Sequence, residues 1–149
     1  MKVDKQLRAA ARLYAVQALF QMEAADEGME TVRQQFWSHR FGAETEDGEM
    51  QEADTDLFDA ILSTAVERQA KIDQMTNHAL DARWPIARID PTLRAIFRAA
   101  GAELVSLGTP PKVVINEYVE ITRDFSDDEK QAKFANAVLD AVAKTITPS

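Results

Sequence analysis

The sequence of 149 residues contains no cysteine. This absence excludes a disulfide framework, thiolate metal sites and cysteine nucleophiles, and it fits a reducing compartment. The two histidines, His39 and His78, are far apart in the sequence and match no metal-ligand spacing such as HExxH. We therefore predict ordinary surface or packing roles for them, with no metal ion and no cofactor.

Long apolar runs are also missing. No stretch of about 18 apolar residues, the length that spans a membrane, occurs anywhere in the sequence. Charged residues interrupt the first apolar segments before the core of a signal peptide can form. We expect a cytoplasmic protein without a membrane segment.

Catalytic motifs are absent as well. There is no Gly-rich phosphate loop, no GxSxG and no dinucleotide-binding fingerprint. Glu117 with Glu120, and the cluster Asp127–Glu129, contain the carboxylates that divalent cations prefer. Acids at a helix start also favour the helix dipole, however, and acids on an outer helix face are simply solvated. The sequence therefore predicts a protein that is not an enzyme.

Acidic residues are abundant but confined. The net charge is −8, and residues 24–59 hold eleven acids against two bases. Residues 1–23 carry a net charge of +2 and residues 60–149 a net charge of −1. Because local charge governs a binding site, the overall acidity does not exclude nucleic acid. The apolar-poor stretch Gly42–Ala53 (GAETEDGEMQEA) predicts a mobile acidic loop at about 42–56.

Helical periodicity dominates what remains, and it predicts an all-α fold in one domain spanning residues 1–149. Only Val113–Ile115 would also suit a strand. Their continuation at helical spacing to Tyr118, Ile121 and Phe125 favours a helix with Phe125 inward. About seven helices are expected. The first four cover about residues 5–23, 31–40, 54–75 and 77–83. The fifth begins at 91 and stops at 108, the sixth follows the prolines and ends at about 125, and the seventh covers 126–144.

Local signals place the ends of these helices. Asp4 is a candidate N-cap of the first helix, and Asp54–Asp56 offer several for the third, whose inward stripe includes Gln69. Asp90-Pro91 indicates a helix start and Gly108 a C-terminal stop. Ser126-x-x-Glu129 has the pattern of a capping box for the last helix.

The residues suited to binding are more distinctive than those suited to catalysis. Single-stranded RNA is read by aromatic rings that stack on bases, beside cations that meet phosphates. Lys133-Phe134 supplies both, and Asn136 adds an amide able to pair with a base edge. Each also has a structural interpretation: Phe134 in the core, and the cations on a solvated face. The other candidate cations are Arg94 and Arg98 as one stripe, Lys112 after the prolines, and Lys5, Arg8 and Arg12 on the outer face of the first helix.

Four stretches, in order, resemble one known family. Pro111–Ile121 (PKVVINEYVEI) is similar to the pattern PxKVxINExxE[IL], and Lys133–Asp140 (KFANAVLD) is similar to KFVN[GA]VLD. Arg12–Phe20 (RLYAVQALF) and Leu93–Leu104 (LRAIFRAAGAEL) match two further patterns of that family. Together they span nearly the whole chain, which is identified as a member of the NusB antitermination factors.

The resemblance implies seven helices in two packed sub-bundles and no catalysis. It also implies a pairing with a small-subunit ribosomal protein, called NusE in this role. The pair would hold the boxA element of nascent ribosomal RNA, within the antitermination complex that lets RNA polymerase read through terminators. Phe20 would lie on the ribosomal-protein face, and Gln17, Asp128 and Glu129 near the RNA. By matching position, the RNA-facing residues would be Lys2, Arg8, Arg12, Arg98, Lys112, Lys133 and Phe134.

The sequence departs from the family pattern in three places. Ala9–Ala11 dilute a basic run, which predicts weaker RNA affinity or greater dependence on the partner. The interval from Phe125 to Phe134 is one residue longer than usual, and Ser126 replaces a glycine. The acidic 42–56 loop should point away from phosphate.

Two other classes of protein share parts of this pattern. One is an adaptor that binds only proteins. The other is the group of ribosomal-RNA cytosine methyltransferases that begin with a similar helical domain, but this chain contains neither a methyl-donor glycine motif nor a cysteine. The sequence leaves open whether the protein forms a homodimer.

Overall fold

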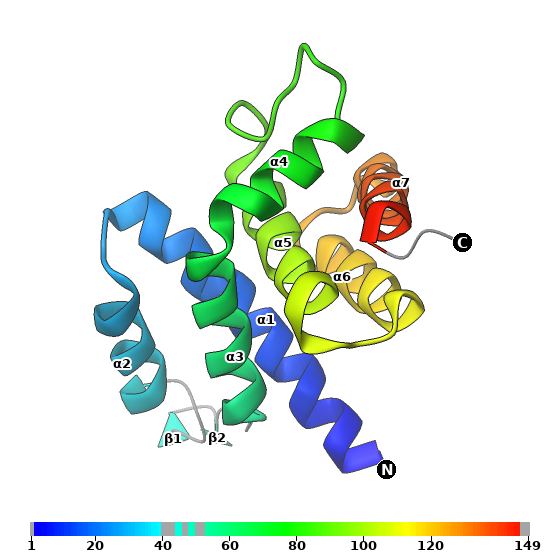
Figure 1. Cartoon of the computed structure of the whole chain (residues 1–149). Helices are drawn as coiled ribbons and strands as arrows, with labels where there is room; N and C mark the ends of the chain where they lie inside the picture. The colour runs from blue at the N-terminus through cyan, green and yellow to red at the C-terminus, as the bar shows by residue number, and fades with distance from the viewer. Residues whose placement is uncertain (1, 40–43, 46–47, 50–52, 147–149) are drawn as a thin grey trace. The chain divides into compact units, whose positions relative to one another are not determined.

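The computed structural model describes the whole chain except residues 1, 40–43, 46–47, 50–52 and 147–149. The described residues form seven α-helices, as the periodicity predicted, and the all-α class is confirmed. A single π-helical turn, η1, continues the fifth helix. The helices are α1 (Lys2–Ala25), α2 (Met29–His39), α3 (Thr55–Glu67), α4 (Gln69–Ala79), α5 (Pro91–Ala102), η1 (Glu103–Leu107), α6 (Pro111–Phe125) and α7 (Glu129–Ile146) (Figure 1).

The acidic segment contains a feature that the sequence did not predict. Two-residue strands, β1 (Glu44–Thr45) and β2 (Gly48–Glu49), pair antiparallel. Most of the predicted mobile loop, Gly42–Ala53, lies outside the described residues.

The chain divides into two compact units, Met1–Ser63 and Thr64–Ser149. In the first unit three aromatic rings form a continuous core. Tyr14 of α1 meets Phe36 of α2 edge-to-face at 6.3 Å between ring centroids, and Phe36 stacks on Phe58 of α3 at 5.6 Å. The Asp54 carboxylate accepts a hydrogen bond from the Leu57 N–H, which confirms that α3 has its N-cap among the acids predicted for it.

The second unit is built around α5, which contacts α4, α6 and α7. Leu93, Ile96 and Phe97 of α5 are buried in its core. Asp90 accepts hydrogen bonds from the Thr92 and Leu93 N–H groups, Pro91 occupies the first helical position, and Gly108 ends the π turn at a φ of 69°. These are the start and stop that the sequence indicated.

The loop between α4 and α5 is fastened by side chains. Arg94 Nη1 donates to the carbonyl oxygens of Ile86 and Ile89 at 2.9 and 3.0 Å, and Asn77 Oδ1 accepts from the Ile86 N–H at 2.7 Å. The interpretation of Arg94 as part of a solvated basic stripe is therefore wrong. Its guanidinium instead donates to backbone carbonyl groups of the loop.

The middle of the chain corrects two predicted helices. The single helix expected over residues 54–75 is interrupted at Arg68. No separate helix forms at 77–83, because residues 77–79 are the last residues of α4, which ends at Ala79. Gln69, predicted inward, is exposed at the start of α4. Apolar periodicity continues across a break of one residue, so it cannot locate one.

Two further helix ends differ from expectation. Asp4 lies inside the first turn of α1, which begins at Lys2. At α7 the Ser126 hydroxyl accepts from the Asp128 N–H rather than from Glu129, and Asp128 itself accepts from the Lys130 N–H at 3.0 Å. The capping box is therefore wrong, because Asp128 caps the helix while Glu129 binds Arg123 instead.

Residues 113–115 lie in α6, which resolves their ambiguity in favour of a helix. Phe125, expected inward at the end of that helix, is 45% exposed. Among the described residues, no helix combines the length and apolar character that crossing a bilayer requires.

Candidate nucleic-acid interface

The Lys133-Phe134 pair lies on the second turn of α7. Lys133 is exposed, and the Phe134 ring is 36% exposed. The ring meets buried Phe97 edge-to-face, with centroids 6.0 Å apart and planes at 63°. Phe134 is thus half core residue and half surface, which reconciles the two interpretations of it. Contact with Phe97 restrains the ring while part of it stays available to a ligand.

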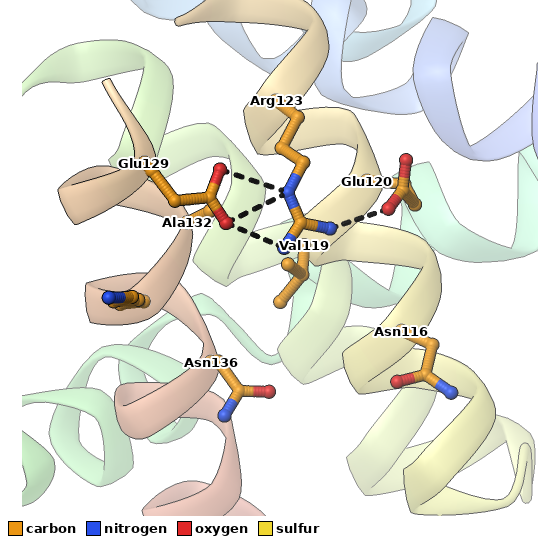
Figure 2. A pocket seen from close by; sticks show the side chains of 8 residues that line it. Asn116, Val119, Glu120, Arg123, Glu129, Ala132 and Asn136 are labelled. Atoms are coloured by element: carbon orange, nitrogen blue, oxygen red, sulfur yellow. Dashed lines mark hydrogen bonds and ion pairs between the residues drawn. The ribbon is translucent and has the colours of Figure 1, made fainter. Parts of the chain in front are cut away.

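A groove of about 420 Å³ lies between α6 and α7 (Figure 2). We call it the α6–α7 groove. Its floor is apolar, because Val119 is 7% and Ala132 1% exposed. The lining residues are Asn116, Val119, Glu120 and Arg123 from α6, and Glu129, Ala132, Lys133 and Asn136 from α7.

One end of the α6–α7 groove is closed by an arginine held between two acids. Arg123 donates to Glu129 at 2.9 Å and to Glu120 on its own helix (Figure 2). These hydrogen bonds raise the pKa of Arg123, and the bond from Arg123 lowers the pKa of Glu129 below its ordinary value of 4.5. The depressed pKa means that the Glu129–Arg123 pair is intact at neutral pH and is lost only as the pH falls through that lowered value.

The other end of the α6–α7 groove carries two amides. Asn116 and Asn136 stand on facing helices, with their amide carbonyl oxygens turned toward the space between α6 and α7 (Figure 2). Both side chains are exposed, and neither makes a hydrogen bond within the part of the chain that the structure describes. Lys112, exposed near the start of α6, lies one turn before Asn116 on the same helix face.

Arg98, predicted to face RNA, is held by an intramolecular ion pair. Its Nε and Nη2 donate to the two carboxylate oxygens of Asp73 on α4 at 3.0 and 2.9 Å. The Arg98 side chain is 17% exposed and that of Asp73 21%. The Arg98 guanidinium already binds a carboxylate in bidentate fashion, and an RNA phosphate would have to approach it in that state. Direct contact between Arg98 and RNA stays a prediction.

The predicted residues of α1 all belong to the first compact unit. Arg8 is exposed as expected, but Arg12 is only 3% exposed, so its placement on a solvated face is wrong. Gln17 is half-buried, and its Oε1 has no hydrogen-bond partner among the described residues. Phe20 is 40% exposed, which suits a partner-binding residue. Lys2 begins α1.

The structure adds two residues that the sequence did not single out as site residues. Asn116 lies inside Pro111–Ile121, one of the stretches that resemble the family. Arg123 lies two helical turns after Asn116. The spacing of Lys112, Asn116, Glu120 and Arg123 is 4, 4 and 3, which places them on one face of α6. This spacing can be read from the sequence, but the sequence does not show which residues of α7 face it. Within the described part of the chain, no three carboxylate or imidazole side chains gather as a metal site would require.

The sequence model of the NusB family matches residues 9–144. The chain belongs to the NusB family. The transcription antitermination protein NusB of Granulibacter bethesdensis is 44% identical over 147 residues, covering 95% of this chain and 90% of that protein. That of Maricaulis maris is 43% identical over 143 residues, covering 95% and 89%.

Solved structures of the family share the fold. NusB of T. maritima superposes with a TM-score of 0.74 at 26% identity, covering 92% of this chain and 90% of that one. A structure of antitermination factors NusB and NusE in complex with double-stranded RNA contains a chain with a TM-score of 0.74 at 24% identity, covering 92% and 96%. The second likeness concerns the fold alone.

Proposed function

We propose that this protein is an RNA-binding factor of transcription antitermination. It binds the single-stranded boxA element of nascent ribosomal RNA together with the ribosomal protein NusE, so that RNA polymerase reads through terminators. It catalyses no reaction, and it acts in the cytoplasm, where bacterial transcripts are made.

Family membership over residues 9–144 and the name shared by its relatives support the antitermination role. The solved complex of antitermination factors NusB and NusE with double-stranded RNA contains both kinds of partner, a protein and an RNA. The observation on this chain that carries the proposal is the juxtaposition of exposed Lys133 with the half-exposed ring of Phe134 on α7. A cation beside a restrained aromatic edge is the arrangement that single-stranded RNA binds.

The proposed residues fall into two groups. Lys133 and Phe134 would meet a phosphate and a base, and Lys112 a second phosphate. Arg98 would contribute through its fixed guanidinium. On α1, Lys2, Arg8 and Gln17 would contact the RNA, and Arg12, which is 3% exposed, would support that surface from beneath it. Phe20 would contact NusE.

The direct test measures the affinity of the purified protein for a boxA-like RNA by fluorescence anisotropy, with and without NusE. Lys133→Ala should weaken binding to all RNAs about equally, whereas Phe134→Ala should mainly reduce the preference for boxA over a scrambled RNA. Lys144→Ala is the matched control, because Lys144 lies three turns further along α7 and pairs with Asp140. RNA affinity unchanged by both Lys133→Ala and Phe134→Ala would overturn the assignment.

The adaptor hypothesis predicts a different pattern. A protein that binds NusE tightly but no RNA, with or without NusE, would be an adaptor only. Phe20→Ala should then weaken NusE binding by the loss of a large apolar contact. In the RNA-binding case, the same variant should leave direct RNA binding intact and reduce only the NusE-dependent part.

A further inference from the structure

We propose that the α6–α7 groove receives one unpaired base of the bound RNA, and that the amides of Asn116 and Asn136 read its edge. The proposal rests on the RNA-binding function and adds a base-reading site to it. The ring of Phe134 and the cation of Lys133 would then be one part of a longer contact across α7.

The charges of the α6–α7 groove favour an uncharged ligand. Lys133 and Arg123 contribute two positive charges, and Glu120 and Glu129 two negative ones. Arg123 is already satisfied by both acids, so it offers little to a phosphate. A nucleobase is polar at its edge but carries no charge, whereas a phosphate in this groove would meet two carboxylates.

The shape and floor of the groove suit a flat ring. The volume of about 420 Å³ falls in the lower part of the range of small-molecule pockets, roughly 300–1,000 Å³. Val119 and Ala132 provide an apolar floor for a ring face. The polar groups lie at the sides of the groove, where the edges of such a ring would be (Figure 2).

The two asparagines supply the chemistry of base reading. Each amide presents a carbonyl acceptor and an NH₂ donor, and this pair matches the donor–acceptor edge of adenine in particular. Bases of single-stranded RNA expose their Watson–Crick and Hoogsteen edges to such groups. Since neither amide is engaged within the described residues, reading a base would break no existing hydrogen bond there.

The helical geometry of α7 connects the groove to Phe134. Successive helical residues are about 100° apart around the axis. Phe134 points toward α5, where it meets Phe97, and Asn136 lines the groove on the side of α6. Lys133 projects between these two directions. A strand crossing α7 would therefore place one base at Phe134, a phosphate at Lys133 and another base in the groove.

The test combines protein variants with modified RNA. Asn116→Ala and Asn136→Ala should each weaken binding of the boxA-like RNA about tenfold, because an amide that pairs with a base contributes discrimination of this order. Gln74→Ala, which removes an exposed amide from α4 of the same unit, is the control and should have no effect. Both asparagines are exposed, so circular dichroism and melting temperature should match the wild type.

Abasic substitution locates the base that is read. RNAs lacking one base at each position in turn are titrated against wild type and the Asn116→Ala/Asn136→Ala double variant. At one position, removal of the base should cost the wild type about tenfold or more and the double variant much less, since the two changes remove the same interaction. Losses that multiply at every position would overturn the proposal.

Other outcomes separate this inference from the proposed function. If Lys133→Ala and Phe134→Ala weaken RNA binding while the asparagine variants do not, the RNA function stands and the base site is wrong. If the asparagine variants weaken binding of NusE without RNA, the groove serves a protein and the inference is overturned. If no RNA binds even with NusE present, the proposed function itself fails.

Discussion

Gly101 sets how closely α4 and α5 approach each other. A Cβ atom placed on Gly101 would lie 2.5 Å from Cγ2 of Ile72, a distance that real side chains do not reach. Ile72 is 1% exposed and branched, so it has no space into which to move. The glycine is therefore required by packing rather than by its backbone conformation.

Replacing this glycine should destabilise the protein. Gly101→Ala should lower the free energy of unfolding by about 1–3 kcal/mol through overpacking, measured by urea denaturation. In an Ile72→Ala background the same change should be neutral or stabilising by about 0.5–1 kcal/mol, because alanine is the better helix former once the clash is gone. An equal loss in both backgrounds would contradict the packing explanation.

At the scale of a helix, the start of α7 shows a division of roles between two neighbouring acids. Asp128 caps the helix by accepting from the Lys130 N–H, and Glu129 reaches back to Arg123 of α6. One carboxylate therefore fixes where the helix begins, and the next ties it to its neighbour across the α6–α7 groove. This division places Lys133 and Asn136 opposite the polar face of α6.

The cap can be tested by substitutions at adjacent positions. Asp128→Ala should lower the free energy of unfolding by about 1 kcal/mol, the usual contribution of an N-cap. Asp127→Ala removes the same charge one residue earlier and should cost much less, as should Ser126→Ala. If Ser126→Ala were the most costly of the three, the capping box would be the correct description after all.

For the molecule as a whole, affinity for RNA has to arise despite a net charge of −8. Phosphate contacts release counterions, so each contributes to the slope of log affinity against log salt. The uncharged amides of Asn116 and Asn136 in the groove should contribute nothing to that slope. Charge-dependent and base-dependent binding are therefore separable by experiment.

We expect affinity for the boxA-like RNA to fall steeply with potassium chloride concentration. Lys133→Ala and Lys112→Ala should each reduce the magnitude of the slope by about 1, since each removes one proposed phosphate contact. Asn116→Ala and Asn136→Ala should weaken binding at every salt concentration without changing the slope. A slope reduced by the asparagine variants would indicate that the groove contacts phosphate.

Several features of this protein follow from local sequence alone. The 3.6-residue periodicity predicted the all-α class and the helices α1, α2, α5, α6 and α7. Asp90-Pro91 and Gly108 placed the ends of the α5–η1 segment, because caps depend on backbone groups only a few residues away. The family resemblance was equally legible, since it depends on residues in order. Lys133-Phe134 needed no fold to be noticed, as the two are adjacent.

Only the tertiary structure decided what each of the polar residues does. Arg94, Arg98 and Arg12 look alike in sequence, yet one holds loop carbonyls, one binds Asp73 and one is buried. Asn116 and Asn136 are twenty residues apart and share a groove only because α6 and α7 pack side by side. Packing between segments that are far apart in the sequence determines which residues become partners. No local sequence pattern contains that information.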